Sequence, residues 1–322
     1  MGIAADRVRR AEWVIDLVGA SCLAAALLAQ AGRVFPPLDA LSNFAPFWLI
    51  GSVSAGLGGL AAARGNRRWV LLGLGLAGAV VAANMLLPEF TRPIAGAGAD
   101  GSRLKVIVFN AWDRNPDESG TAAWIAGERP DLVLMQETEP AIEQALVARG
   151  FNMVQTMAHT AVFSRQRPIR PAYVVPMGLW PRLPDLTRAT FAFGGGTFNV
   201  VSLHMDRHFG DADSQDISAL AQLAALYPSD TLIVAGDFNT TPWSLAMRRL
   251  DRALPLQRRD RALATWPARL PMLGGAPAPL PFLAIDHLYA GSAWRTISVA
   301  RGPRSGSDHY PLIVTLSMPP TR

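Results

Sequence analysis

The feature that most limits how this chain can fold is a series of three apolar runs in its first quarter. They cover residues 13–32, 44–63 and 69–87, and Asp16 is the only charged residue in them. Each run is about 20 residues long, the length of helix that crosses the hydrocarbon core of a bilayer. Helices buried in soluble proteins are usually shorter. The sequence therefore predicts a three-span transmembrane anchor over residues 1–87.

The first run has a second interpretation, as a cleaved signal peptide. Three arginines at positions 7, 9 and 10 would be its basic n-region, and Ala29-Gln30-Ala31 would be the small-residue cleavage site. The run is long for such a segment and contains Trp13 and Asp16. The two later runs would hold the protein in the membrane in either case.

The short segments around the apolar runs carry unequal charge, which predicts an orientation. Residues 7–10 and 64–68 each contain three arginines, whereas residues 33–43 contain only Arg33 and Asp39. Because basic short loops stay on the cytoplasmic side, the N-terminus is predicted to be cytoplasmic. Three crossings then place everything after Leu87 outside. In a double-membrane bacterium, this describes a multi-pass inner-membrane protein with a periplasmic domain.

The remainder of the chain is predicted to be a Gly/Pro-rich linker, 88–102, and one domain, 103–318. Its length suffices for a single sizeable α/β domain. The single cysteine, Cys22, lies in the first apolar run, so the domain has no internal disulfide. Residues 88–322 hold 22 arginines, one lysine and 21 acidic residues, a net charge of +2. This near balance argues against nucleic acid as the partner, because backbone binders carry a marked basic excess.

Within this domain, short apolar runs alternate with amphipathic segments. Helices are expected near 121–127, with Ser119 as N-cap, and near 140–148 and 213–226. A hairpin is expected at Gly194-Gly195-Gly196. Strands and helices mixed in this way favour an α/β fold with two mixed β-sheets covered by helices.

Polar side chains recur where the apolar runs of this domain end. Strands that end at a common rim are where open α/β sheets bind ligands. Carboxylate and amide oxygens are ligands for Mg²⁺ or Mn²⁺, and histidines transfer protons near neutral pH. The pattern therefore predicts metal-assisted cleavage of a phosphate ester. The residues concerned are Asn110, Glu137, His204, Asp237, Asn239, Asp286, Asp308 and His309.

Several of these residues have simpler interpretations. Asn110 would serve equally as an amide that caps a turn, and Glu137 as a carboxylate at a helix start. Asp237-Phe238-Asn239 is also typical of an Asx turn. His208 lies near His204 and could replace it.

Three further polar residues stand close to these runs. His287 follows Asp286 on the alternate face of its strand and is predicted to be structural or peripheral. His159 is predicted to flank the site or to lie on the surface. Asn115 either touches the metal or substrate or belongs to a turn with Pro116.

The sequence words that carry these residues resemble a known family. They are KVIVFNAW, PDLVLMQET, VVSLHMD, TLIVAGDFN, FLAIDHLY and SGSDHYPLIV, in that order. Over residues 103–317 they resemble the endonuclease/exonuclease/phosphatase superfamily, which includes DNase I-like nucleases, sphingomyelinases and inositol phosphatases. The resemblance implies a DNase I-like four-layer sandwich, with two sheets packed face to face. Three spans before a short outer domain also resemble the VanJ-like membrane proteins linked to glycopeptide resistance.

The resemblance assigns the metal-binding residues. Glu137 resembles the family's main ligand, with Asn110 beside it, and Asp308 resembles a residue that completes or supports the metal shell. The implied cofactor is Mg²⁺ or Mn²⁺.

The resemblance also assigns the proton-transfer residues. Asp237 resembles the residue that orients or deprotonates the attacking water, and Asn239 the amide that holds the phosphate or Asp237. His309 resembles the imidazole that contacts the phosphoryl group and transfers a proton, with Asp286 as the carboxylate that fixes its tautomer. His204 resembles a second histidine on a phosphoryl oxygen.

The sequence departs from the DNA-cleaving branches of this superfamily. No tyrosine lies between Gln136 and Arg165, where abasic-site nucleases grip a phosphate. Instead, apolar stretches occur at 270–283 and 177–181, which form either ordinary packed loops or an apolar lip toward the bilayer. The predicted function is extracytoplasmic hydrolysis of a phosphorylated lipid, such as a polyprenyl pyrophosphate or a phospholipid. An anchored nuclease and a non-enzymatic envelope protein are the alternatives.

Overall fold

The computed structural model describes residues 2–94, 101–155, 159–172, 183–205 and 214–318 of this 322-residue chain. The chain divides into two compact units. The first consists of residues 2–92 together with 242–248, and the second contains most of the remaining residues. The segment 177–181 and His208 lie outside the described residues.

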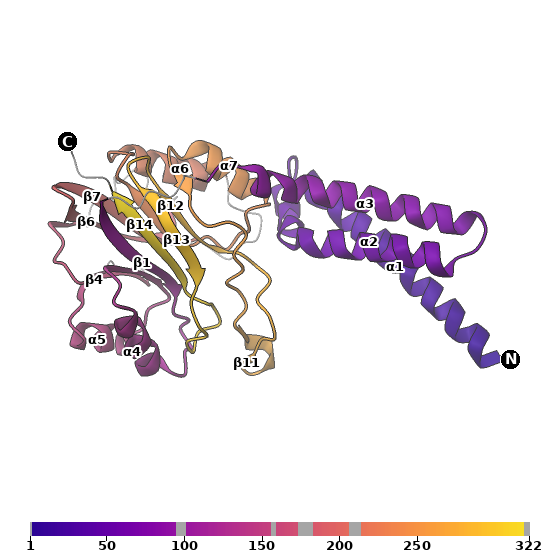
Figure 1. Ribbon diagram of the computed structural model, residues 1–322, viewed down its shortest axis with the longest axis horizontal. Coiled ribbons are helices and arrows are strands. Elements are labelled where there is room, and N and C mark those ends of the chain that lie inside the picture. The colour runs from indigo at the N-terminus through magenta and orange to yellow at the C-terminus, as the bar shows by residue number, and fades with distance from the viewer. Residues whose placement is uncertain (1, 95–100, 156–158, 173–182, 206–213, 319–322) are drawn as a thin grey trace. The chain divides into compact units, whose positions relative to one another are not determined.

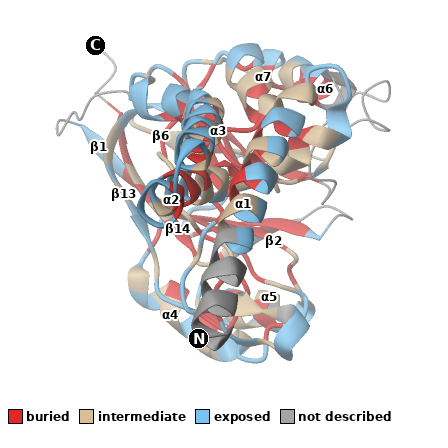
Figure 2. Ribbon diagram, turned by 90° about the vertical axis from the view of Figure 1, so that its right-hand side faces the viewer, coloured by how far each residue is buried: buried red, intermediate tan, exposed pale blue. Residues whose placement is uncertain are grey.

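The first unit is built on three long helices. They are α1 (Gly2–Ala31), α2 (Ala45–Ala62) and α3 (Asn66–Thr91), and the 3-10 helix η1 (Pro36–Phe44) joins α1 to α2. All three regions are long and apolar enough to cross a membrane. Figure 2 shows many exposed residues along these helices, although the sequence here is largely apolar. Helix α3 continues past Leu87 to Thr91.

Small residues set the close packing of α2 against α3. A Cβ atom on Gly75 would lie 2.7 Å from Cα of Gly56, so only glycine fits there. The one charge of the first apolar run is paired, because Arg67 donates a 2.5 Å hydrogen bond to Asp16. The start of the α1 span and the basic turn between α2 and α3 therefore lie at one end of the unit.

Helix η1 binds residues that are far away in the sequence. The Asp39 carboxylate is buried and accepts hydrogen bonds of 2.8 Å from the backbone N–H groups of Leu245 and Ala246. The Trp243 indole donates a 3.0 Å hydrogen bond to the carbonyl of Asn43. Asp39 thus caps the start of α7 (Leu245–Ala253), which explains why 242–248 belong to the first unit.

The second unit contains two six-stranded mixed sheets (Figure 1). The first has the order β13-β14-β1-β2-β4-β3. Its strands are β1 (Ser102–Asn110), β2 (Leu132–Gln136), β3 (Asn152–Gln155), β4 (Thr160–Ser164), β13 (Arg295–Arg301) and β14 (Leu312–Met318). The second has the order β5-β6-β7-β8-β12-β9. Its strands are β5 (Arg170–Ala172), β6 (Asp185–Phe193), β7 (Gly196–His204), β8 (Ile233–Asp237), β9 (Gln257–Arg258) and β12 (Asp286–Ala290).

Alternation along β1 shows how the layers are packed. Val106 and Val108 lie in the core that both sheets share, together with residues such as Phe198 of β7. Ile107 and Phe109 point the other way, into a core with α4 (Glu118–Glu128) and α5 (Pro140–Ala148). Helix α6 (Ser214–Ala225) lies toward the second sheet (Figure 1). Two mixed sheets flanked by helices confirm the predicted fold class and match the DNase I-like architecture.

Two local features differ from the sequence predictions. Helix α4 begins earlier than predicted, and its N-cap is Asp117 rather than Ser119, because the Asp117 carboxylate accepts from Gly120 N–H at 3.0 Å. The proline-rich stretch before β12 is a small ribbon, formed by β10 (Arg269–Leu270), the 3-10 turn η3 (Pro271–Leu273) and β11 (Ala276–Pro277).

Candidate active site

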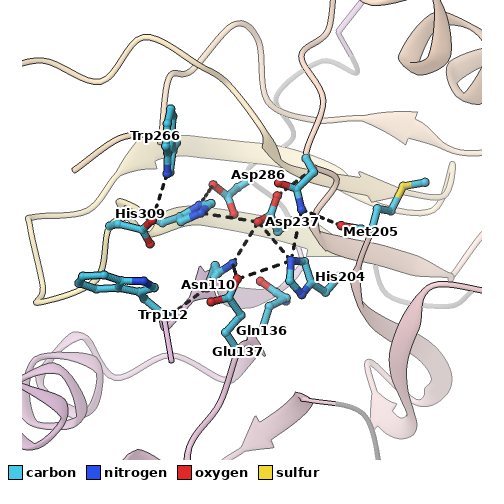
Figure 3. Close-up of polar contacts among 12 residues, drawn as sticks. Asn110, Trp112, Gln136, Glu137, His204, Met205, Asp237, Trp266, Asp286 and His309 are labelled. Atoms are coloured by element: carbon cyan, nitrogen blue, oxygen red, sulfur yellow. Dashed lines mark hydrogen bonds and ion pairs between the residues drawn. The ribbon is translucent and has the colours of Figure 1, made fainter. Parts of the chain in front are cut away.

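The strand ends of both sheets bring the predicted polar residues together (Figure 3). Strand β1 ends at Asn110, and Glu137 directly follows β2, its parallel neighbour. In the second sheet, β7 and β8 are parallel and end at His204 and Asp237, which pair with each other in the register. Strand β12 begins at Asp286, opposite Asp237. One rim thus collects side chains from five strands of two sheets.

Asn110 bridges two carboxylates. Its amide nitrogen donates to Glu137 Oε1 at 2.9 Å and to Asp237 Oδ2 at 3.0 Å. Its amide oxygen accepts from the backbone N–H of Trp112 at 2.9 Å, which fixes the orientation of the amide. Asn110 therefore caps a turn, as the simpler interpretation of this residue predicts. It also holds the side chains of Glu137 and Asp237 together.

His309, in the loop before β14, contacts two aspartates of the second sheet. His309 Nδ1 lies 2.9 Å from Asp286 Oδ2, and His309 Nε2 lies 3.6 Å from Asp237 Oδ2. All three side chains are buried. Asp286 therefore orients the imidazole and leaves its other nitrogen facing Asp237.

His204 and Asn239 form the opposite wall of the site. His204 Nε2 lies 3.7 Å from both Glu137 Oε1 and Asp237 Oδ2. Asn239 Nδ2 lies 3.2 Å from His204 Nε2 and donates to the Met205 carbonyl at 2.6 Å. The Asn239 backbone N–H donates to Asp237 Oδ1 at 2.8 Å, so this segment is an Asx turn as well as part of the rim.

Burial and neighbouring charges perturb the ionisation of the central groups. Burial raises the pKa of Asp237, although His309 opposes this change. Burial alone would lower the pKa of His309, but Asp286 and Asp237 raise it to about 10. The geometry thus favours a protonated His309 held between two acidic groups.

The donor set fits a divalent cation. Three carboxylates, from Glu137, Asp237 and Asp286, face two histidines. Within the described part of the chain, the buried Oδ1 of Asp286 has no hydrogen-bond partner. Ligand atoms of Asp237, Asp286 and His309 lie within 4.8 Å of one another, which defines one possible metal group. Glu137 offers another position, with a side chain that is 11% exposed. We favour Glu137, because Mg²⁺ keeps several water ligands and Asp286 is fully buried against His309.

Asp308 lies beside this cluster and is held by a residue that the sequence analysis missed. Trp266 Nε1 donates to Asp308 Oδ2 at 3.2 Å. Ser307, also missed, donates to the Asn110 carbonyl at 2.7 Å and accepts from His309 N–H at 2.9 Å. Ser307 directly precedes Asp308 in the sequence, and this position could have indicated that it belongs to the site. Nothing local in the sequence pointed to Trp266.

The remaining polar residues lie apart from the cluster. His287 is buried on the alternate face of β12, within 2.6 Å of Asp260 Oδ2 and 3.1 Å of the Thr240 carbonyl. Asn115 bonds to the Ala111 carbonyl at 3.1 Å and is part of the loop structure. His159 is exposed.

Comparison with known families identifies the class of this protein. The endonuclease/exonuclease/phosphatase family matches residues 107–309, more than half of the chain. The chain therefore belongs to this family, whose members are generally hydrolases that act on phosphodiester bonds. The VanJ-like branch is not established by this match. A search of curated proteins finds no match.

Solved structures support the same fold. An endonuclease/exonuclease/phosphatase protein from Bacteroides vulgatus is 18% identical, with a TM-score of 0.56 over 67% of this chain and 99% of its own. D. rerio TDP2 in complex with a single-strand DNA product is 18% identical, with a TM-score of 0.51 over 67% of this chain and 100% of its own. A conserved Enterococcus faecalis protein of unknown function is 16% identical, with a TM-score of 0.51 over the same shares. At these identities the similarity shows the fold alone.

Proposed function

We propose that this chain is a membrane-anchored, metal-dependent phosphoesterase that hydrolyses a phosphorylated lipid on the extracytoplasmic face. The observation that carries the proposal is the buried His309–Asp286 pair, which faces Asp237 at the rim where Glu137 also lies. A positioned acid, a positioned base and a hard-ligand carboxylate are the groups that phosphate ester hydrolysis requires.

The residues divide the chemistry among them. A divalent cation held by Glu137, with Asn110 beside it, would neutralise charge on the phosphoryl oxygens. Asp237 orients the attacking water and accepts its proton, and its raised pKa makes it a better base. His309 is protonated and donates to the departing oxygen, while Asp286 keeps the ring in position. His204, held by Asn239, contacts a phosphoryl oxygen.

The membrane part of the proposal rests on the first unit. Three helices have the length and composition of membrane spans, and the basic segments at one end predict a cytoplasmic N-terminus. The proposed catalytic residues follow the third span, so a cytoplasmic N-terminus would put them on the extracytoplasmic side, the periplasm in a double-membrane bacterium. This architecture also supports a VanJ-like branch.

An exposed apolar segment supports a lipid substrate. In the ribbon region around η3, Met272 is 97% exposed, Leu273 67% and Leu280 73%. Phe282, at the end of this segment, packs its ring against Trp266, which donates to Asp308 beside His309. The end of this apolar segment at Phe282 is therefore linked through Trp266 to the loop that carries His309, which supports an apolar lip beside the site.

The proposal is tested by substrate competition with the full-length protein in detergent. Polyprenyl pyrophosphate, a phospholipid and plasmid DNA are incubated side by side with Mg²⁺, and Asp237→Asn is the inactive control. The proposal predicts fastest hydrolysis of a lipid phosphate. Faster cleavage of DNA than of any lipid would support the nuclease alternative, and no turnover of any substrate would support a non-enzymatic role.

A further inference from the structure

A separate cavity lies beside the catalytic loop, in the second unit. Its volume is about 310 Å³, and its wall includes Trp124 of α4 and the segment 303–306. Gly306 directly precedes Ser307, whose hydroxyl bonds both His309 N–H and the Asn110 carbonyl. The cavity and the candidate active site therefore share one loop.

Two arginines give this cavity its chemistry. Arg269 and Arg304 both line it. Arg269 is held by a 3.0 Å hydrogen bond from Nη1 to the Gly275 carbonyl, and Arg304 by a 2.6 Å bond from Nη2 to the Ala278 carbonyl. A guanidinium has five N–H donors, so both side chains are fixed in place while most of their donors are not used by these bonds.

One of those donors is both buried and unpartnered. Arg269 Nε is shielded from solvent and makes no hydrogen bond to any residue that the structure describes. Burying an unsatisfied donor is unfavourable, so the Arg269 guanidinium keeps hydrogen-bonding capacity that its bond to the Gly275 carbonyl does not use. Among the described residues that line the cavity, Asp117 is the one acidic residue, and it already accepts from Gly120 N–H as the cap of α4. The charged groups of the wall therefore leave a net charge of +1.

Hydrogen bonds join α4 to the loop segment that lines the cavity. Thr121 donates a 2.5 Å hydrogen bond to the Ser305 carbonyl, and Asn115 donates to the Thr121 hydroxyl at 3.2 Å. A side chain at position 306 would collide with Asn115, and Gly306 has a φ of +80°, so this close approach needs glycine. These contacts hold the segment that carries Arg304 against α4.

We propose that this cavity binds a second phosphate group of the substrate, distinct from the one that is cleaved. Paired guanidinium groups are suited to phosphate oxygens, and Trp124 offers an apolar wall for the adjoining organic part. Two arginines in one pocket match a single anion and not the row of phosphates of a nucleic acid. The proposal rests on the proposed phosphoesterase function in one respect, because it takes the bound anion to be part of the substrate.

The binding test does not depend on catalysis. Pyrophosphate is titrated calorimetrically into the full-length protein in detergent with EDTA. R269Q and R304Q should each weaken binding by about tenfold or more, whereas R269K should retain part of the affinity because it keeps the charge. R103Q is the matched control, since Arg103 is an exposed arginine of β1 that is not among the residues lining the cavity.

The same titration with H309A separates the cavity from the catalytic cluster. Unchanged affinity in H309A supports the proposal. If H309A lost pyrophosphate binding while R269Q retained it, the anion would bind in the catalytic cluster and the proposal would be overturned. Absence of binding to the wild-type protein would overturn it as well.

A kinetic test then identifies the source of the anion. Two soluble phosphate esters are compared, identical except that one carries a second phosphate on a short linker. R269Q should raise KM about tenfold for the bisphosphate only and leave kcat nearly unchanged, as loss of uniform binding does. Equal KM values for R269Q and wild type on the bisphosphate would overturn a substrate role. If neither ester is hydrolysed, the proposed phosphoesterase function is contradicted, but the calorimetric result on anion binding is unaffected.

Discussion

His309 Nδ1 and Asp286 Oδ2 lie 2.9 Å apart, in a hydrogen bond that joins the loop before β14 to the start of β12. The register of β12 explains why these two residues meet. Asp286 is the first residue of β12 and lies opposite Asp237 on β8. The next residue, His287, points to the other face, where it meets Asp260 and the Thr240 carbonyl. One strand therefore orients the His309 imidazole on one side and supports the turn after Asp237 on the other.

Substitutions in the cluster should affect turnover more than folding. Glu137→Ala, Asp237→Asn and His309→Ala should each lower kcat by about 10²-fold or more, because each removes a metal, base or acid role. His204→Ala should also impair turnover. The exposed His159→Ala is the control. Wild-type kcat in His309→Ala would contradict the assigned acid.

Removal of divalent metal should abolish activity. The carboxylates of Glu137, Asp237 and Asp286 leave the site with an excess of acidic groups, which a cation would offset. EDTA should stop turnover, and Mg²⁺ or Mn²⁺ should restore it in the same sample. Full activity in chelator would exclude the metal-dependent mechanism.

The membrane orientation can be read with reporter fusions. A reporter that is active only outside the cytoplasm should be active after Arg322 and silent after Arg67, because basic short loops stay inside. The Asp16–Arg67 pair is consistent with both residues lying at the same membrane face. The reverse pattern of reporter activity would place the domain in the cytoplasm and exclude a substrate on the outer leaflet.

Acid should destabilise the second unit through Asp260. Burial alone would raise the pKa of Asp260, but His287, Arg258 and the Leu288 amide lower it to about 2 from 3.8. Its ionised form therefore stabilises the fold by about 2 kcal/mol above pH 4, and this stabilisation is lost as the pH falls through about 2. Denaturant unfolding of the full chain, followed by tryptophan fluorescence at pH 5 and pH 3, should show a smaller pH difference in Asp260→Asn. The exposed Asp185→Asn should behave as wild type.

Local sequence patterns predicted most of the rim but not its supports. Apolar runs that end in polar residues placed Asn110, Glu137 and Asp237, because a buried strand and its exit are encoded by adjacent residues. The Asp260–His287 and Trp266–Asp308 pairs join residues 27 and 42 positions apart, and no periodicity reports such contacts.

His287 shows which part of a residue's environment a local pattern predicts. The alternation of side chains correctly placed it on the face of β12 away from Asp286, but it did not reveal that the ring is fully buried against two acceptors. His287→Ala should therefore reduce stability, although its direct effect on catalysis should be smaller than that of His309→Ala.

The exposed apolar segment provides the last prediction, which concerns the substrate. Met272, Leu273 and Leu280 are exposed, and the segment adjoins Trp266 through Phe282. Their replacement by serine should lower activity on a long-chain lipid phosphate in bilayers, because less apolar surface would enter the membrane.

The same triple variant should largely keep its activity on a short-chain, water-soluble phosphate, since none of the three side chains belongs to the catalytic cluster. Leu226→Ser is the matched control, because Leu226 is 55% exposed and lies outside this segment. Activity should be measured on both substrates, in vesicles and in solution. Equal loss on both substrates would indicate a folding defect. No loss on the lipid, together with cleavage of plasmid DNA, would replace the lipid substrate with nucleic acid.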